Sequence, residues 1–156
     1  MNKQHADAQV LAEQVGAAMW PRDRTVNALG MTLVSIQPGG AVVSMPVRSD
    51  MVNSHHICHG GLIFTLADSA FAYACNSYNR NTVASACHID FLAPVKEGDT
   101  LEAEAVERSL SGRTGVYDVT VRVHDGKTVA LFRGKSHRID GEVIAELQQI
   151  AHNSSK

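Results

Sequence analysis

The sequence lacks the features that mark several large classes of protein. It has no apolar run near the roughly 20 residues that span a bilayer, so we expect no membrane association. Neither sign of charge is in large excess, because 14 basic residues stand against 16 acidic ones and the net charge is -2. This balance argues against a protein that binds nucleic acid by releasing counterions.

Cysteine is also scarce. The three cysteines, Cys58, Cys75 and Cys87, are odd in number and widely spaced, so they predict no disulfide framework. The amino-terminal stretch is polar, and we expect no secretory leader. Together these observations favour a reducing, cytoplasmic location.

The motifs of several enzyme classes are missing. The chain has no Gly-x-Ser-x-Gly elbow, no Gly-x-Gly-x-x-Gly, no P-loop and no His-Glu-x-x-His. His55, His56 and His59 lie beside Cys58, but zinc sites generally need a second closely spaced ligand pair, which the other cysteines do not supply. Adjacent residues such as Cys58 and His59 rarely place their side chains for proton transfer. We therefore expect no metal, no cofactor and no catalytic thiol.

The 156 residues suffice for one domain, with 44% hydrophobic and 19% charged residues. We expect it at residues 29–140, after a helical extension at residues 1–28 and before a tail at residues 141–156, either a short helix or a fraying end. Apolar spacing and turn residues predict the elements. The expected helices are residues 6–19 and 22–29, and the expected strands are residues 31–36, 41–47, 82–91, 100–109, 115–124 and 127–139.

A long helix begins at the Gly60-Gly61 pair, between the second and third of these strands, and ends near residues 76–81. The fold class is therefore α+β, with one antiparallel sheet and one central hydrophobic helix. The helix is apolar nearly all round, as buried helices are. A sheet of this size covers one flank, so we expect a second subunit to cover the other.

Asp68 lies about two turns inside this apolar helix. It is too deep to cap the helix, and no Lys or Arg lies one turn away to pair with it. An unpaired carboxylate in an apolar setting costs stability, and such groups concentrate at functional sites. The alternative is an Asp that faces a solvated crevice or bonds to a loop. Asp90 is a weaker candidate, which we expect to hydrogen-bond a turn near Pro94.

The Gly60 amide is suited to an oxyanion, because free N–H groups at a helix start attract negative charge. Asp68 is suited to activating a water or to direct attack. Eight residues of helix span about 12 Å, whereas the two groups must flank one carbon at about 3 Å each. We therefore expect each site to combine Gly60 of one protomer with Asp68 of the other.

From about residue 29 to residue 139 the chain resembles the hotdog-fold acyl-CoA thioesterases, and within them the phenylacetate-degradation branch. His59-Gly60-Gly61 with Asp68 is shared by several thioesterase groups, whereas the segments at residues 70–77 and 132–138 are more specific to that branch. The matching segments are residues 53–61, 66–77, 84–91, 114–118 and 132–138.

The resemblance implies hydrolysis of a coenzyme A thioester, with phenylacetyl-CoA or a ring-hydroxylated phenylacetyl-CoA as substrate. It further implies that Asp68 activates the water, that the Gly60 amide polarises the carbonyl, and that His59 and Asn53 support them. It also implies a homodimer that assembles into a homotetramer. On the same helix, Gly61 and Thr65 are candidates for substrate contact.

Arg133, Lys135 and His137 share one face of the last strand. Arg133 and Lys135 are candidate substrate-binding residues, because coenzyme A carries several phosphate charges that a cationic strip could hold. The alternative, an exposed charged face that discourages aggregation, is the commoner arrangement.

Two other functions are compatible with the same helix. A hotdog hydratase or dehydratase would use a His with a carboxylate, in a context absent here. A non-catalytic acyl-CoA sensor would need an extension that binds a partner or DNA, and the amino-terminal helix is too short and weakly charged to read DNA.

Overall fold

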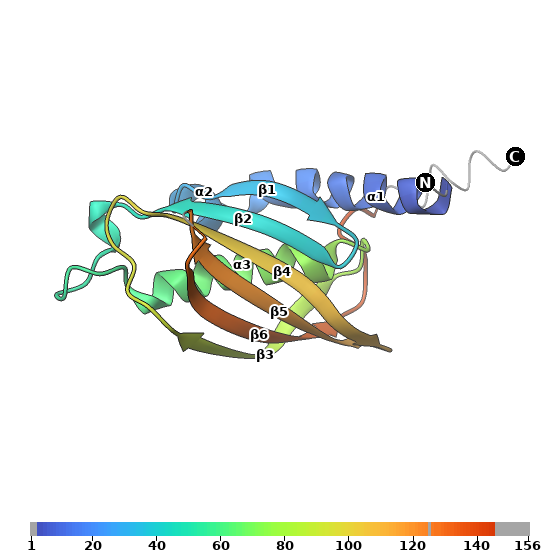
Figure 1. The fold of residues 1–156 in the computed structure, drawn as a ribbon. Helices are drawn as coiled ribbons and strands as arrows, with labels where there is room; N and C mark the ends of the chain where they lie inside the picture. The colour runs from blue at the N-terminus through green and yellow to red at the C-terminus, as the bar shows by residue number, and fades with distance from the viewer. Residues whose placement is uncertain (1–2, 125, 146–156) are drawn as a thin grey trace, which may run out of the picture.

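A computed structural model describes residues 3–124 and 126–145, and it confirms the predicted α+β class. Six strands form one antiparallel sheet in the order β1-β2-β4-β5-β6-β3, and one long helix lies along one face of it (Figure 1). The helices are α1 (Lys3–Met19), α2 (Arg24–Ala28) and α3 (Gly60–Asn76). The strands are β1 (Thr32–Gln37), β2 (Gly40–Pro46), β3 (Thr82–Phe91), β4 (Thr100–Ser111), β5 (Thr114–Val123) and β6 (Thr128–Arg138).

The elements before β1 differ from the expected ones. Helix α1 begins at Lys3, earlier than predicted, and the second helix predicted at residues 22–29 is shorter. A 3-10 turn at Trp20–Arg22 comes first, with Pro21 near its start. Asp23 then caps α2 by accepting a hydrogen bond from the Val26 N–H at 3.2 Å. The polar cap therefore sets where α2 begins.

Helix α3 packs against the inner face of the sheet and contacts all six strands. The ring of Phe71 on α3 packs against the rings of Tyr117 on β5 and Phe132 on β6, with ring centroids 5.5 and 5.9 Å apart. A side chain at Gly134 would place its Cβ 2.8 Å from the Phe71 ring, so this position needs glycine. Close packing therefore fixes the distance of α3 from the sheet and its rotation about its own axis.

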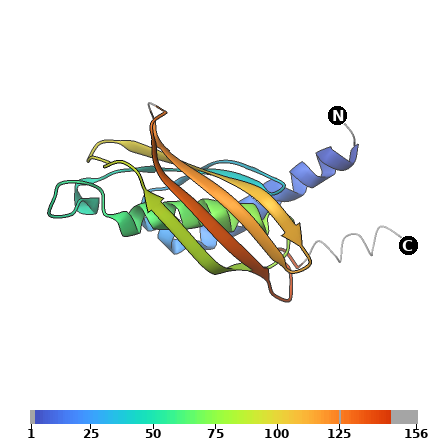
Figure 2. The ribbon, with the colours of Figure 1, turned by 60° about the horizontal axis from the view of Figure 1, so that its bottom comes forward.

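Strand β3 forms one edge of the sheet, and within the described residues it pairs only with β6 (Figure 2). Most of its side chains are exposed, among them Val83 and Phe91, and Leu92 follows directly. The side of α3 that the sheet leaves uncovered carries Leu62, Thr65, Asp68, Ser69 and Ala72, all partly exposed. Together they form one open strip of the protein.

The described part of the carboxyl-terminal tail, residues 141–145, contains no helix or strand. The rest of that predicted tail lies outside the described residues, and the domain boundaries at residues 28 and 140 stay predictions. Across residues 3–124 and 126–145, no helix is long and apolar enough to cross a membrane.

Candidate active site

The start of α3 presents a free backbone amide. His59 is the N-cap, and its Nδ1 accepts a weak hydrogen bond from the Gly61 N–H at 3.4 Å. Its own backbone N–H donates to the Met51 carbonyl at 2.8 Å, which anchors the helix start to the preceding loop. Among the described residues, the Gly60 N–H has no acceptor. This amide is therefore available to an oxygen that carries negative charge.

Asn53 shapes the loop that leads into α3. Its Oδ1 accepts hydrogen bonds from the backbone N–H groups of His55, at 2.9 Å, and Ile57, at 3.4 Å. Its backbone N–H donates to the Ile57 carbonyl at 2.8 Å. The side chain thus closes a tight local turn, as Asn commonly does. Within one protomer, Asn53 therefore positions the start of α3 by closing this turn.

Phe91 was not identified from the sequence, yet its ring lies against Gly60. A Cβ at residue 60 would lie 3.0 Å from the Phe91 ring. Phe91 is 52% exposed at the end of β3, so it offers apolar surface beside the free amide. No sequence motif marks this contact, because it depends on how β3 runs past the helix start.

A cleft of about 260 Å³ adjoins the same end of the helix. Its walls include the side chains of Met51, Val52 and Leu62, with His59 and Gly61 beside them and Asp50 also lining it. Mostly apolar walls next to a free amide suit a ligand with an apolar body and a carbonyl oxygen.

Asp68 lies on the uncovered side of α3. Within the described part of the chain its carboxylate has no hydrogen bond or ion pair, and burial alone raises its pKa above the usual 3.8. Its helix neighbours are already satisfied, because Thr65 Oγ1 donates to the Gly61 carbonyl at 2.8 Å and Ser69 Oγ donates to the Thr65 carbonyl at 2.7 Å. Of the two alternatives, a bond to a loop is therefore wrong within the described residues, whereas a carboxylate that faces solvent matches the partial exposure of Asp68 in a single protomer.

Two thiols lie close enough to this carboxylate to be affected by its charge. The negative charge of Asp68 contributes, after burial, to raising the pKa of both Cys75 and Cys87. Cys87 comes from the edge strand β3 and Cys75 from the next turns of α3. Neutral thiols give Asp68 little compensation for lost hydration, which keeps its carboxylate basic.

Gly60 and Asp68 do not meet within one protomer. Eight residues of α3 separate them by about 12 Å along the helix axis. Both nevertheless border the open strip formed by α3 and β3, one at its end and the other near its middle. The structure therefore presents the free amide and the carboxylate on one uncovered surface, at separate places.

Arg133 and Lys135 lie elsewhere, on the exposed outer face of the sheet. On β6 they alternate with buried residues that face α3. Arg133 makes a bidentate ion pair with Asp118, at 2.6 and 2.9 Å, and this pair lowers the pKa of the Asp118 carboxyl. Among the described residues the Lys135 ammonium group has no partner. The structure thus does not bring these two residues to Asp68 of the same protomer.

The contact that the sequence analysis predicted for Asp90 is wrong. The Asp90 carboxylate lies 3.1 Å from Nε2 of His88 on the same exposed strand face, and not at a turn near Pro94. Residues two apart on a strand share a face, so this local pair forms more readily than the predicted turn contact. In the part of the chain that the structure describes, no three His, Cys, Asp or Glu side chains gather as a metal site.

Comparisons with known proteins agree with this geometry. The model of the Thioesterase superfamily matches residues 55–130. The acyl-coenzyme A thioesterase PaaI of Escherichia coli (strain K12) is 53% identical over 135 residues, which cover 86% of this chain and 96% of that protein.

Solved structures give the same result. That of the E. coli PaaI protein, from the phenylacetic acid degradation operon, matches with a TM-score of 0.85 and 52% identity, covering 86% of this chain and 97% of that one. A Streptococcus mutans UA159 protein bound to acetyl-CoA matches with a TM-score of 0.69 and 28% identity, covering 72% and 90%.

The sheet wrapped along one central helix is thus the hotdog fold, and the chain belongs to the thioesterase superfamily. Within that superfamily it is an acyl-coenzyme A thioesterase, an enzyme that hydrolyses the thioester bond of acyl-CoA. The resemblance seen in the sequence is confirmed.

Proposed function

We propose that this thioesterase hydrolyses phenylacetyl-CoA or ring-hydroxylated phenylacetyl-CoA in phenylacetate catabolism. The observation that carries its mechanism is the unpaired, half-buried Asp68 carboxylate on the same open strip as the free Gly60 amide. The substrate class is supported by the origin of the similar E. coli protein in a phenylacetic acid degradation operon. The apolar cleft beside His59 and the exposed Phe91 ring offer surface for an aryl group.

In the proposed reaction Asp68 acts as a general base. Its carboxylate takes a proton from a water molecule, and the resulting hydroxide attacks the thioester carbonyl carbon. The carbonyl oxygen becomes an oxyanion, which the Gly60 N–H stabilises. When the tetrahedral intermediate collapses, the C–S bond breaks, the thiolate of coenzyme A takes the proton from Asp68, and the free acid leaves. Direct attack by Asp68, through an anhydride, uses the same two groups.

The remaining site residues support this pair. His59 holds the first turn of α3 through its cap, and Asn53 shapes the loop before it, so both position the Gly60 amide. Gly61 borders the cleft, and Thr65 lies on the uncovered side of α3 between Gly60 and Asp68. We place both next to the substrate.

We also propose that each complete site is shared between two protomers. The proposal is supported by the distance of about 12 Å between Gly60 and Asp68 along the helix, because an oxyanion donor and a base must each lie about 3 Å from one carbon. A two-fold axis that sets two α3 helices antiparallel would place Gly60 of each beside Asp68 of the other, giving two sites per dimer. The unpaired edge of β3 and its exposed apolar side chains suit such an interface, and pairs of dimers would form a tetramer.

The substrate class is tested with a panel of CoA thioesters. We expect kcat/KM for phenylacetyl-CoA and its ring-hydroxylated forms to exceed that for long-chain fatty acyl-CoA by at least about tenfold, because a short apolar cleft rejects long chains. Release of free thiol is the measurement. A crotonyl-CoA control, followed at the absorbance of the conjugated enoyl group, reports hydration instead. Equal rates across the panel, or hydration without thiol release, would refute this assignment.

The coenzyme A phosphates are proposed to contact the cationic face of β6, with Lys135 the more available residue. Arg133 already shares the Asp118 carboxylate with Arg108, whereas Lys135 has no anionic partner among the described residues. We expect KM to rise with ionic strength, and this rise to be weaker in Lys135→Ala than in Arg133→Ala. Steady-state kinetics from low to high salt measure it. The same salt dependence in Lys135→Ala as in wild type would remove the proposed contact.

A further inference from the structure

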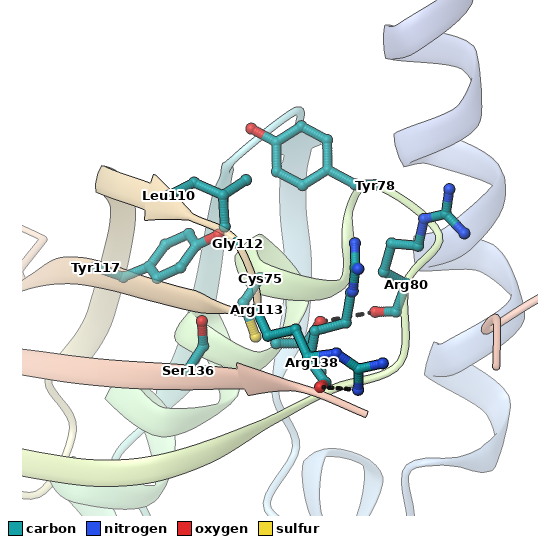
Figure 3. A pocket seen from close by; sticks show the side chains of 10 residues that line it. Cys75, Tyr78, Arg80, Leu110, Gly112, Arg113, Tyr117, Ser136 and Arg138 are labelled. Atoms are coloured by element: carbon teal, nitrogen blue, oxygen red, sulfur yellow. Dashed lines mark hydrogen bonds between the residues drawn. The ribbon is translucent and has the colours of Figure 1, made fainter. Parts of the chain in front are cut away.

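A second cavity lies at the opposite end of α3 from Gly60. It has a volume of about 180 Å³ and is bounded by the last turn of α3, the β4–β5 hairpin and the end of β6 (Figure 3). Cys75, at its base, is 15 residues along α3 from Gly60, which corresponds to about 22 Å of helix, and seven residues from Asp68, which corresponds to about 10 Å. The proposed reaction uses no residue of this cavity, so its lining needs a separate explanation.

The inner wall of this cavity is apolar or neutral. It includes Cys75, Leu110, Tyr117 and Ser136, and Figure 3 shows the last three on one side of it. Burial raises the pKa of the Cys75 thiol to about 12, so the thiol is protonated at neutral pH. The Tyr117 hydroxyl donates to Oε2 of Glu107 at 2.8 Å, which satisfies both groups. The wall therefore offers apolar surface and the hydroxyl of Ser136. Tyr78 also lines the cavity, and burial with the neighbouring Glu107 carboxylate raises the pKa of its hydroxyl to about 12.

The other side of the cavity carries three arginines, Arg80, Arg113 and Arg138 (Figure 3). Arg113 Nη2 lies 3.0 Å from a carboxylate oxygen of Asp140, and Arg80 Nη1 lies 3.3 Å from one of Glu142. Arg113 also donates to the Arg138 carbonyl at 3.3 Å. Among the described residues, the Arg138 guanidinium has no acceptor.

Carboxylates are thus the partners that two arginines of this rim already have. The third arginine has unused donors beside an apolar cavity. Guanidinium groups bind carboxylates through paired hydrogen bonds. A cavity of about 150 Å³ accepts a benzene ring, so 180 Å³ has room for one ring with its carboxylate at the rim.

We propose that this pocket binds a small organic carboxylate with one ring-sized apolar group, the ring against Tyr117 and Leu110 and the carboxylate on Arg138. The apolar wall favours such an acid over inorganic phosphate or a nucleotide, which would leave that wall without a partner. Thioester hydrolysis releases a carboxylic acid, so the enzyme's own product class fits the pocket. The choice of an aryl acid rests on the proposed function, whereas the carboxylate rests on the arginines.

The test uses phenylacetate as the probe and the full-length protein. We expect saturable changes in the amide NMR signals of Gly112, Arg113 and Ser136, also in an Asp68→Asn protein. Arg138→Gln should weaken this binding at least about tenfold, because it removes a charge-assisted contact. Arg138→Lys should bind more tightly than Arg138→Gln but less tightly than wild type, because the charge remains and the paired hydrogen bonds are lost. Arg122→Gln is the matched control, since Arg122 pairs with Glu104 away from the cavity.

Three results would overturn the proposal. Equal binding of neutral 2-phenylethanol would show that the arginines do not select a carboxylate. Inorganic phosphate or free coenzyme A shifting these signals while phenylacetate does not would identify a phosphate site instead. Phenylacetate signals confined to residues near Gly60 would place the acid in the catalytic cleft alone. If the aryl-CoA assignment fails, the thiol-release panel shows this separately. Binding of a ring-bearing carboxylate to this pocket is then tested with cyclohexylacetate in place of phenylacetate.

Discussion

Replacing Asp68 by asparagine is expected to lower turnover of an aryl-acyl-CoA by at least about a hundredfold, with little change in KM. Asparagine has nearly the same shape but cannot take a proton from water, so the step that loses its catalyst is the attack on the carbonyl. The carboxylate has no partner within the described residues, so no ion pair is broken by the change. Thiol release at saturating substrate measures the effect.

The control for this variant is Asp90→Asn, on the outer face of the neighbouring strand. Among the described residues Asp90 has one polar side-chain partner, His88, and both side chains are exposed, so the turnover of Asp90→Asn should match that of the wild type. The wild-type rate should also fall toward low pH with an apparent pKa above 3.8, because burial raises the pKa of Asp68 and the base works only when ionised. Near-normal turnover of the Asp68→Asn protein would remove Asp68 from the mechanism.

The same substitution should stabilise the fold near neutral pH. The pKa of Asp68 is higher in the folded protein than its usual 3.8, so the folded state binds this proton more tightly than the unfolded state. The stability of the wild type therefore falls as the pH rises from 3.8 to the higher pKa of Asp68 in the folded protein, and above that pKa the loss is complete. Asp68→Asn lacks this loss. Its melting temperature should exceed that of the wild type at pH 7, and the difference should vanish below about pH 3.8.

Much of the fold could be predicted because local signals and tertiary packing agree. The six predicted strands all form, each with ends within two residues of the expected ones. Strand β5 alternates because one of its faces meets α3, and α3 itself follows from an apolar run after two glycines. The start of α2 was missed, since a 3-10 turn and the Asp23 cap depend on side-chain geometry that apolar spacing does not reveal.

The candidate site was only partly predictable, for a similar reason. Asp68, Gly60 and His59 lie on one helix, so their spacing fixes their relations. Arg133 pairs with Asp118 because the register of β5 and β6 sets these two residues opposite each other. The sequence of either strand alone does not predict this register. Phe91 reaches Gly60 through the path of β3 beside the helix. Contacts such as these two, between elements distant in sequence, could not be predicted from the sequence.

Mixed dimers of two inactive variants are expected to recover about half of the wild-type activity. One subunit carries Asp68→Asn and the other carries Gly60→Val, whose side chain would collide with Phe91 and obstruct the amide. In a shared arrangement, one of the two sites receives an intact Gly60 from the first subunit and an intact Asp68 from the second. Two different affinity tags, used under conditions in which pairs of dimers are separated, isolate the mixed dimer, and thiol release measures its turnover.

The reverse arrangement is the matched control. A wild-type subunit is paired with one that carries both Asp68→Asn and Gly60→Val, so the dimer holds the same two substitutions in total. If sites are shared, each site now contains one defective group and the dimer should be nearly inactive. If each site lies within one chain, this second dimer keeps half of its activity and the first loses all of it. Because the two dimers have the same composition, a difference between them reports only which subunit supplies each group, whatever the substitutions do to folding.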